Sequence, residues 1–428
     1  MSAPAAGAGR TTRAWVLHPD IRGARNRRAP LPALAEAVAL ADALGPVRVV
    51  GQSVVPLQRV RPGTFFGSGK LEELGRQFRE REVELVLVDG PLTPVQQRNL
   101  ERAWKVKLLE RTGLILEIFA ERARSREGVL QVELAALAYQ RTRLVRAWTH
   151  LERQRGGLGF VGGPGETQIE ADRRAIDEAM IRIRRQLGRV RRTRSLHRRA
   201  RARLPRPVVA LVGYTNAGKS TLFNRLTGAR VRAEDMLFAT LDPTMRAAEL
   251  PGGQRIILSD TVGFVSDLPP QLVAAFRATL EEVLSADLIL HVRDISHPDS
   301  ARQAEEVEKI LEDLGVEPVT GRLEIWNKID RLGAEERAAT RRRAARAGGV
   351  LAVSARSGAG LDALAAAIAA RLGGAELREE EIFLEFPQGR KRAWLYEQGV
   401  VESETRAEGG YRLALRWTAR QRKRFREI

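Results

Sequence analysis

The segment that most constrains the fold is an eight-residue loop near the centre of the chain. It consists of Gly213-Tyr214-Thr215-Asn216-Ala217-Gly218-Lys219-Ser220 and fits the pattern G-x-x-x-x-G-K-[ST]. The apolar run 208–212 precedes it, and a helix-like stretch beginning at Thr221 follows it. In that context the loop amides and the helix N-terminus cradle phosphates, Lys219 reaches the outer phosphates and Ser220 meets Mg²⁺. The sequence therefore predicts a phosphate loop in an α/β domain.

Three further motifs follow in the order that a guanine-nucleotide site requires. Asp260-Thr261-Val262-Gly263 ends an apolar run and is expected at the carboxyl end of a strand, where Mg²⁺ and the γ-phosphate lie. Asn327-Lys328-Ile329-Asp330 ends another run, and a carboxylate at Asp330 can accept hydrogen bonds from guanine but finds no such donors on adenine. Ser354-Ala355-Arg356 ends the last run, where a backbone N–H can meet guanine O6. Together these motifs predict GTP binding.

A second lysine loop carries a weaker resemblance to a phosphate site. In Gly67-Ser68-Gly69-Lys70, Leu71 stands in place of Ser or Thr, and Thr64 stands where the first glycine belongs. We interpret this segment as the turn that starts a helix. An anion site here is the alternative.

At these positions the chain resembles the HflX family of translation-factor-related GTPases. Besides the phosphate loop and the guanine motifs, the likeness rests on Phe238-Ala239-Thr240-Leu241-Asp242, Phe66–Leu74, Leu130–Ala135 and Gly165–Arg174. It covers roughly residues 15–375, and the last 50 or so residues resemble the C-terminal domain of that family less specifically. The resemblance implies a cytoplasmic, monomeric GTP hydrolase that binds the 50S ribosomal subunit and acts in ribosome splitting, rescue or assembly under stress.

The resemblance also implies roles for particular residues. Lys219, Thr240 and Gly263 are expected to act in catalysis, with Ser220 and Thr240 as ligands of Mg²⁺. Only the family pattern favours Thr240 over Thr244 as the switch threonine. Asn216 has two interpretations, support of a monovalent cation or bonding within the loop. Nucleotide contacts are expected from residues 213–221, 238–242, 260–263, 327–330 and 354–356.

Phe264 departs from the pattern of many small GTPases, which carry a water-orienting Gln at this position. An apolar ring cannot orient water. Either another group of the chain does so or the ribosome completes the site.

Other classes of GTPase fit the sequence less well. The chain has no Cys, so it lacks the C-terminal Cys of a tRNA-modifying GTPase and cannot form disulfides or Cys-ligated metal sites. It has one set of G motifs, whereas a two-G-domain assembly factor has two, and residues 15–124 are not the Gly-rich domain of the Obg type. Two alternatives remain, a non-catalytic RNA- or membrane-binding scaffold and an ATP-using RNA-remodelling enzyme.

The chain is expected to form several domains in a multidomain α/β fold. Short apolar runs alternate with amphipathic stretches, which is typical of βαβ units on parallel sheets. The expected segments are a disordered tail over 1–13, an N-terminal α/β domain over 14–126, a helical hairpin over 127–204, a Ras-like G domain over 205–374 and a small α+β domain over 375–428.

The hairpin is predicted from apolar residues that recur about every 3.5 positions. They are Leu130, Leu134, Leu137, Leu144, Trp148 and Leu151, then Ile169, Ile176, Met180, Ile183, Leu187 and Val190. Arg141 occupies a seam position in the first set. The Gly-rich stretch 156–165 separates the two helices, as a flexible turn or as a point of close approach to an RNA backbone. Thr167, with Glu170, is expected to cap the second helix.

Charge points to a polyanionic partner. The net charge is +19, and the stretch from Arg173 to Arg206 holds 14 Arg against only Asp177 and Glu178. A solvated helix face is the ordinary explanation of a charge run. We favour contact with rRNA, because so dense a run repels itself unless phosphates neutralise it. Peripheral contact with an anionic membrane is the alternative, and no targeting or membrane-spanning segment is expected.

Overall fold

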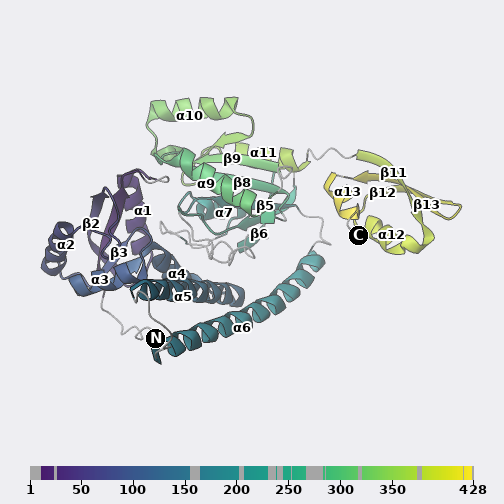
Figure 1. Ribbon diagram of the computed structural model, residues 1–428. Helices are drawn as coiled ribbons and strands as arrows, with labels where there is room; N and C mark the ends of the chain where they lie inside the picture. Colours follow the sequence, from purple (N-terminus) through teal and green to yellow (C-terminus); the bar gives the residue numbers. More distant parts are fainter. Residues whose placement is uncertain are drawn as a thin grey trace.

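The computed structural model describes residues 11–23, 27–154, 164–201, 207–229, 238, 244–251, 253–266, 283–284, 286–316, 321–373, 378–417 and 419–426. Side chains within 145–154, 164–169 and 191–201 are outside that description. The chain forms three sheets and a pair of long helices (Figure 1). The multidomain α/β prediction is confirmed.

The N-terminal domain is a four-stranded parallel sheet in the order β2-β1-β3-β4. Its strands are β1 (Thr12–Ile21), β2 (Val47–Leu57), β3 (Leu85–Val88) and β4 (Lys107–Glu110), and its helices are α1 (Pro30–Asp42), α2 (Ser68–Glu80), α3 (Pro94–Trp104) and α4 (Arg111–Arg122). Alternate residues of β1 enter different cores: Ala14 and Val16 pack with α1 and α4, and Trp15 and Leu17 with α2 and α3. Helices therefore cover both faces of the sheet.

One sequence interpretation in this domain changes, and another agrees with the structure. The tail was expected to run to Arg13, but β1 begins at Thr12 and is a central strand of the sheet. The lysine loop at Gly67 does start a helix, because Gly67 is the N-cap of α2 and Lys70 pairs with Glu73 at 2.7 Å. The structure therefore agrees with the interpretation of this loop as the start of a helix.

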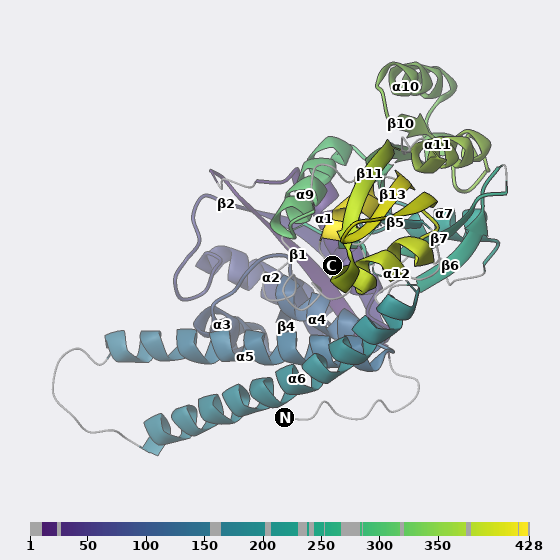
Figure 2. The ribbon, with the colours of Figure 1, turned by 90° about the vertical axis from the view of Figure 1, so that its right-hand side faces the viewer.

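The two long helices are α5 (Arg126–Gln154) and α6 (Pro164–Arg201), and they lie side by side in Figure 2. Their seam buries Leu130, Ile183 and Leu187, packed by Leu134, Leu137 and Val190. Arg141, the polar residue of the seam, pairs with Asp177 of α6 at 2.9 Å. The predicted cap at Thr167 is wrong, because α6 begins three residues earlier, at Pro164.

The G domain is built on a six-stranded sheet in the order β10-β9-β8-β5-β7-β6, with β6 antiparallel to β7 and the other pairs parallel. The strands are β5 (Val208–Gly213), β6 (Thr244–Glu249), β7 (Arg255–Asp260), β8 (Leu288–Asp294), β9 (Gly321–Asn327) and β10 (Val350–Ala352). The helices include α7 (Lys219–Thr227), α9 (Ser300–Asp313), α10 (Ala334–Arg346) and α11 (Leu361–Gly373). The edge strand β6 was not expected from the sequence.

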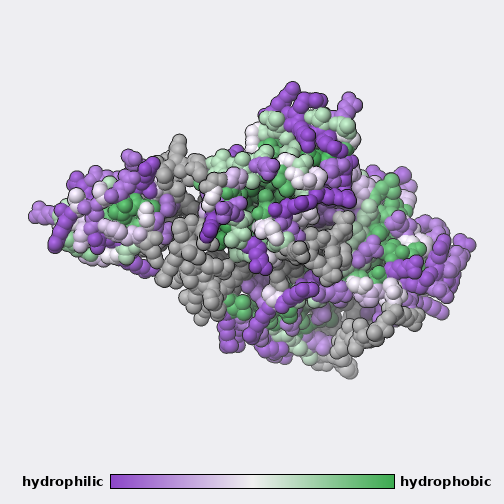
Figure 3. Space-filling model, turned by 180° about the vertical axis from the view of Figure 1, so that it is seen from behind, coloured by the Kyte–Doolittle hydropathy of each residue, from purple (hydrophilic) through white to green (hydrophobic). Residues whose placement is uncertain are grey.

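A small antiparallel domain follows, at the opposite end of the molecule from the N-terminal sheet (Figure 1). It consists of β11 (Arg378–Glu385), α12 (Gly389–Glu397), β12 (Val401–Ala407), β13 (Gly410–Trp417) and α13 (Ala419–Arg426), with strand order β11-β13-β12. It has a core of its own around Leu395, Leu413 and Trp417. Figure 3 shows mostly hydrophilic residues over its outer surface and over α10.

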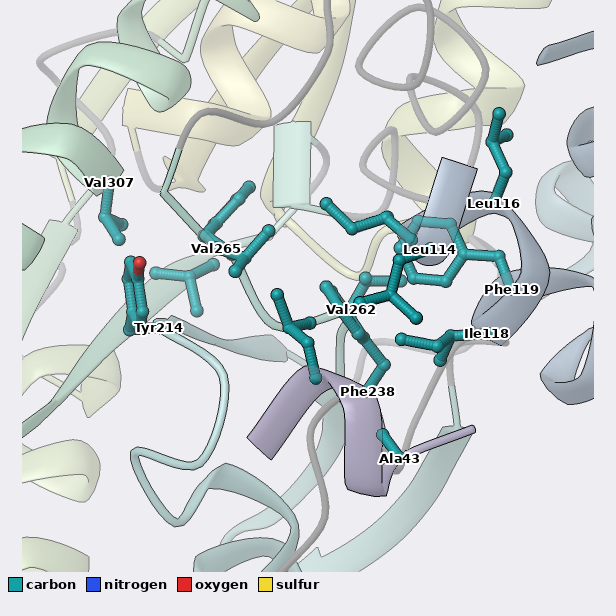
Figure 4. Packing of buried hydrophobic residues seen from close by; sticks show 14 of the residues in the cluster. Ala43, Leu114, Leu116, Ile118, Phe119, Tyr214, Phe238, Val262, Val265 and Val307 are labelled. Carbon is teal, nitrogen blue, oxygen red and sulfur yellow. The ribbon is translucent and has the colours of Figure 1, made fainter. Parts of the chain in front are cut away.

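The N-terminal domain and the G domain share one apolar core. Leu114, Ile118 and Phe119 of α4 pack in the same cluster as Val262 and Val265 of the G domain (Figure 4). The ring of Phe119 meets Phe238 edge to face, with centroids 4.6 Å apart. The two domains therefore meet through a buried interface that lies beside the phosphate loop.

Candidate nucleotide-binding site

The phosphate loop joins β5 to α7 at the carboxyl edge of the G-domain sheet. Two of its glycines are required because neighbouring atoms leave no room for a Cβ. A Cβ on Gly213 (φ 149°) would lie 2.1 Å from the carbonyl oxygen of Val292, and one on Gly218 (φ 91°) would lie 2.3 Å from Asn327 Nδ2. Both positions need glycine because the loop passes directly over β8 and the end of β9.

Lys219 is held inside the loop. Its Nζ donates to the carbonyl oxygens of Gly213 at 3.1 Å and Tyr214 at 2.7 Å, and the residue is 6% exposed. Burial lowers the pKa of Lys219 to about 8, with Asp260 opposing that shift and Lys328 adding to it. An anion beside a buried ammonium stabilises its charged form. The position of Lys219 therefore suits the binding of a nucleotide phosphate, which is the role of the phosphate-loop lysine.

Ser220 and Asp260 supply oxygen atoms at the base of the loop. The Ser220 hydroxyl donates to Asp260 Oδ2 at 2.7 Å, and Asp260 ends β7 fully buried. Mg²⁺ prefers oxygen ligands such as hydroxyl and carboxylate groups. A protein usually supplies one or two of them, and water and substrate phosphates complete the coordination. Within the described ranges, no group of three or more His, Asp or Glu side chains could hold a metal by itself. The pair therefore fits a magnesium ion that arrives with a nucleotide.

Asn327 ties the guanine motifs to the phosphate loop. Its Nδ2 donates to the carbonyl oxygen of Ala217 at 2.8 Å, and its Oδ1 accepts from the N–H of Ala355 at 2.9 Å. Asp330 Oδ1 accepts from the hydroxyl of Ser354 at 2.5 Å. The structure thus brings three of the predicted motifs together. Of the segment Ser354-Ala355-Arg356, in which a backbone N–H was expected to meet guanine O6, the Ala355 N–H is here bonded to Asn327.

Asn216 and Lys328 face each other across the mouth of the site. Lys328 Nζ lies 3.4 Å from Asn216 Oδ1 and 2.9 Å from Asp294 Oδ2. Both residues adopt left-handed backbone conformations, with φ of 57° and 65°. The contact joins the phosphate loop to the guanine motif rather than lying within the loop, so neither interpretation of Asn216 is decided by it.

The predicted switch residues are only partly described. Ala239, Thr240, Leu241 and Asp242 lie outside the described residues. Phe238 is described, and its ring packs against Phe119 in the shared core, so the expected nucleotide contact is replaced by an apolar one. Thr244, the alternative switch threonine, begins β6 and pairs in register with Asp260.

The segment after the Asp260 motif lies against the phosphate loop. The N–H of Thr215 donates to the carbonyl oxygen of Phe264 at 2.6 Å, and the N–H of Phe264 donates to that of Gly213 at 3.1 Å. Phe264 itself is 3% exposed and belongs to the shared core. The aromatic ring that replaces the usual Gln is therefore a packing residue in this conformation.

Sequence reasoning missed Glu36, Ser266 and Arg111, the polar residues that Tyr214 and this segment contact. Tyr214 donates its hydroxyl to Glu36 of α1 at 3.0 Å and lies 2.5 Å from the hydroxyl of Ser266. Burial raises the pKa of Tyr214, and the charge of Glu36 adds to that effect, so the phenol stays protonated. Arg111 of α4 also contacts Ser266. These residues come from distant parts of the chain, and no motif links them.

Four family models match successive parts of the chain. Residues 32–120 match the GTP-binding GTPase N-terminal family, 122–201 the GTP-binding GTPase middle region, 208–328 the 50S ribosome-binding GTPase family, and 339–426 the HflX C-terminal domain. No helix within the described residues is long and apolar enough to cross a membrane.

Similar proteins span most of the chain. GTPase HflX of Magnetococcus marinus is 54% identical over 370 residues, which cover 86% of this chain and 84% of that protein. GTPase HflX of Escherichia coli is 45% identical and covers 82% of this chain and 81% of its own length. A GTP-binding protein of Sulfolobus solfataricus, solved in complex with GDP, is 22% identical over 85% of this chain and 99% of its own, with a TM-score of 0.46. On the sequence matches, the chain belongs to the HflX family of GTPases and is a GTP hydrolase.

Proposed function

We propose that the protein is a Mg²⁺-dependent GTPase whose nucleotide state controls its attachment to the 50S ribosomal subunit, in ribosome splitting, rescue or assembly under stress. The observation that carries the proposal is the convergence of Lys219, the Ser220–Asp260 pair and the Asn327–Asp330 motif at one edge of the G-domain sheet. The match of residues 208–328 to the 50S ribosome-binding GTPase family supports the partner.

Each residue of the proposed site has a distinct task. Lys219 holds the outer phosphates, and Asp330 selects guanine by accepting from its N–H groups. Ser220 and, by the family pattern, Thr240 would hold Mg²⁺, which would neutralise charge that develops on the phosphates. Gly263 offers its backbone N–H to the γ-phosphate. Because Phe264 is a core residue, the attacking water has to be oriented by another group, and we propose that the ribosome completes this step.

The helical hairpin supplies the surface for rRNA. The described arginines of α6 are exposed, and they are Arg173, Arg174, Arg182, Arg184, Arg185 and Arg189. Figure 2 shows the hairpin along one side of the molecule, where α6 continues from the N-terminal domain toward the G domain. Arginine forks pair with phosphates. A ribosomal partner implies action in the cytoplasm. We propose a monomer as the working unit.

The deciding experiment is co-sedimentation of the full chain with 30S, 50S and 70S particles in GDP and in a non-hydrolysable GTP analogue. GTP turnover is measured in parallel with and without 50S. We expect stronger 50S binding with the analogue and faster turnover with 50S. Equal binding in both nucleotides, or turnover that 50S leaves unchanged, would refute the ribosome-controlled cycle.

Two further arms test the rival functions. A scaffold would bind its partner without any turnover, and an ATP-using enzyme would hydrolyse ATP as fast as GTP. Vesicles of anionic lipid replace 50S in a third arm. Binding to vesicles but not to 50S would transfer the role of the arginines from rRNA to a membrane surface.

A further inference from the structure

A buried ionic network lies at the carboxyl edge of the N-terminal sheet. Arg111, the first residue of α4, donates to Asp89 Oδ1 at 2.5 Å and to Glu36 Oε1 at 2.6 Å. Arg28 also pairs with both carboxylates, at 2.8 Å and 3.1 Å. The side chain of Arg111 is 5% exposed and that of Asp89 is 1% exposed. Such a network fixes the guanidinium of Arg111 in one orientation.

The same guanidinium reaches across the domain boundary. Arg111 Nε and Nη2 donate to the backbone carbonyl oxygen of Ser266 at 3.2 Å and 2.9 Å. The hydroxyl of Tyr214, in the phosphate loop, donates to Glu36 at 3.0 Å and accepts from the backbone N–H of Ser266. Both backbone groups of Ser266 are therefore held by the network, one by Arg111 and the other by Tyr214.

The residues just before Ser266 occupy the neighbourhood of the phosphate-binding lysine. A Cβ on Gly263 would lie 2.9 Å from Lys219 Nζ and 2.8 Å from Thr215 Cα. The N–H of Thr215 is bonded to the carbonyl oxygen of Phe264. Lys219 Nζ, which is bonded to the carbonyl oxygens of Gly213 and Tyr214, therefore lies close against Gly263.

We propose that Arg111 is a positioning residue that sets the preference of the G domain between GDP and GTP. In GTPases this switch segment is ordered by contacts with the γ-phosphate. Lys219 and Gly263 already lie close together, so a γ-phosphate that enters between them shifts the segment that Arg111 holds through Ser266. GDP has no phosphate to place there, so its binding does not oppose the contact. By linkage, loosening the contact strengthens GTP binding, and GTP binding loosens the contact to the same extent.

The test measures equilibrium affinities of the full chain for GDP and for a non-hydrolysable GTP analogue. In Arg111→Gln we expect the ratio of analogue Kd to GDP Kd to fall about ten-fold, within the usual range of coupling between sites, with GDP affinity unchanged. Arg143→Gln is the matched control, because Arg143 of α5 pairs with Glu110 and Gln97 of the N-terminal domain and not with the G domain in any of these contacts. Arg143→Gln should keep the ratio of analogue Kd to GDP Kd that the parent has.

A second variant serves if Arg111→Gln does not fold. Tyr214→Phe keeps the buried ring and removes the hydroxyl that holds Ser266, and it should shift the ratio in the same direction. A parental ratio in a folded Arg111→Gln or Tyr214→Phe variant would overturn the proposal, as would an equal loss of both nucleotides. The inference rests on the nucleotide site proposed above, and failure of the parent to bind GDP would refute that site separately.

Discussion

Asp89→Asn should destabilise the N-terminal domain strongly. The Asp89 carboxylate is 1% exposed and meets His18 Nδ1 at 2.7 Å, Arg28 Nη2 at 2.8 Å and Arg111 Nη1 at 2.5 Å. An amide of the same shape removes the negative charge and leaves the two guanidinium groups short of a counter-charge in the interior. Breaking a buried pair from one side typically costs about 3–5 kcal/mol. We expect a loss of that size in the free energy of unfolding at pH 7.

The pH dependence of that loss has a definite sign. Burial alone would raise the pKa of Asp89, but the hydrogen bond with His18 and the charges of Arg111 and Arg28 hold it well below its usual range. A carboxyl whose pKa is lowered by folding stabilises the native state above its unfolded pKa of about 3.9. The stabilisation is lost as the pH falls below that value, by about 1.4 kcal/mol per pH unit. The parent and Asp89→Asn should therefore converge only below pH 4.

Hydrogen–deuterium exchange of the β1 and β3 amides measures the effect where it arises. The expected loss corresponds to exchange that is faster by roughly two to four orders of magnitude, at about 1.4 kcal/mol per factor of ten. Glu73→Gln is the control, since the Lys70–Glu73 pair has side chains 31% and 45% exposed and should contribute less than about 1 kcal/mol. Two results would show that the network does not stabilise the fold as a buried ion cluster. One is a loss below about 1 kcal/mol in the free energy of unfolding of Asp89→Asn. The other is a difference in that free energy between parent and variant that stays constant as the pH falls through 4.

Three further outcomes are expected. Asp330→Asn should weaken GTP binding by about 1–3 kcal/mol and admit xanthosine triphosphate, because the amide donates where the carboxylate accepted; an unchanged GTP affinity in an equilibrium titration would contradict the guanine-reading role. Replacing Arg182, Arg184 and Arg185 with Gln should lower the slope of log K against log salt for 50S binding by roughly 0.7–0.9 per lost phosphate contact, and a parental slope would make these arginines a solvated face. Leu187→Ala, in the hairpin seam, should cost about 2–5 kcal/mol in hydrogen exchange of α6, and a cost under 1 kcal/mol would mean that the seam is not packed.

The parts of the fold that could be predicted are those with a local signal. The phosphate loop, the parallel strands of the G-domain sheet and the hairpin seam each carry a motif or a period that depends on residues close together in the sequence. The strand β1 has no such signal. Its residues contain His18, Pro19 and Asp20, and it is stabilised by β2 and β3 on either side, which only the tertiary structure brings there.

The site was predictable to the same extent and for the same reason. Lys219, Ser220 and Asp260 lie in motifs and come together because parallel strands end at one edge. Glu36 and Arg111 could not be found this way, because each is an ordinary charged residue whose role depends on a contact between two domains. The burial of Phe264 was equally hidden, since the sequence shows an aromatic ring but not the core that receives it.

The apolar core shared by the N-terminal and G domains has a consequence for cooperativity. Val262, Phe264 and Val265 share a buried cluster with α4, so removing the N-terminal domain would take away part of the apolar surface that covers them. The two domains should then melt together in a single transition, while the C-terminal domain, with its separate core around Trp417, melts independently. An excised G domain would be prone to aggregate unless that face were made polar.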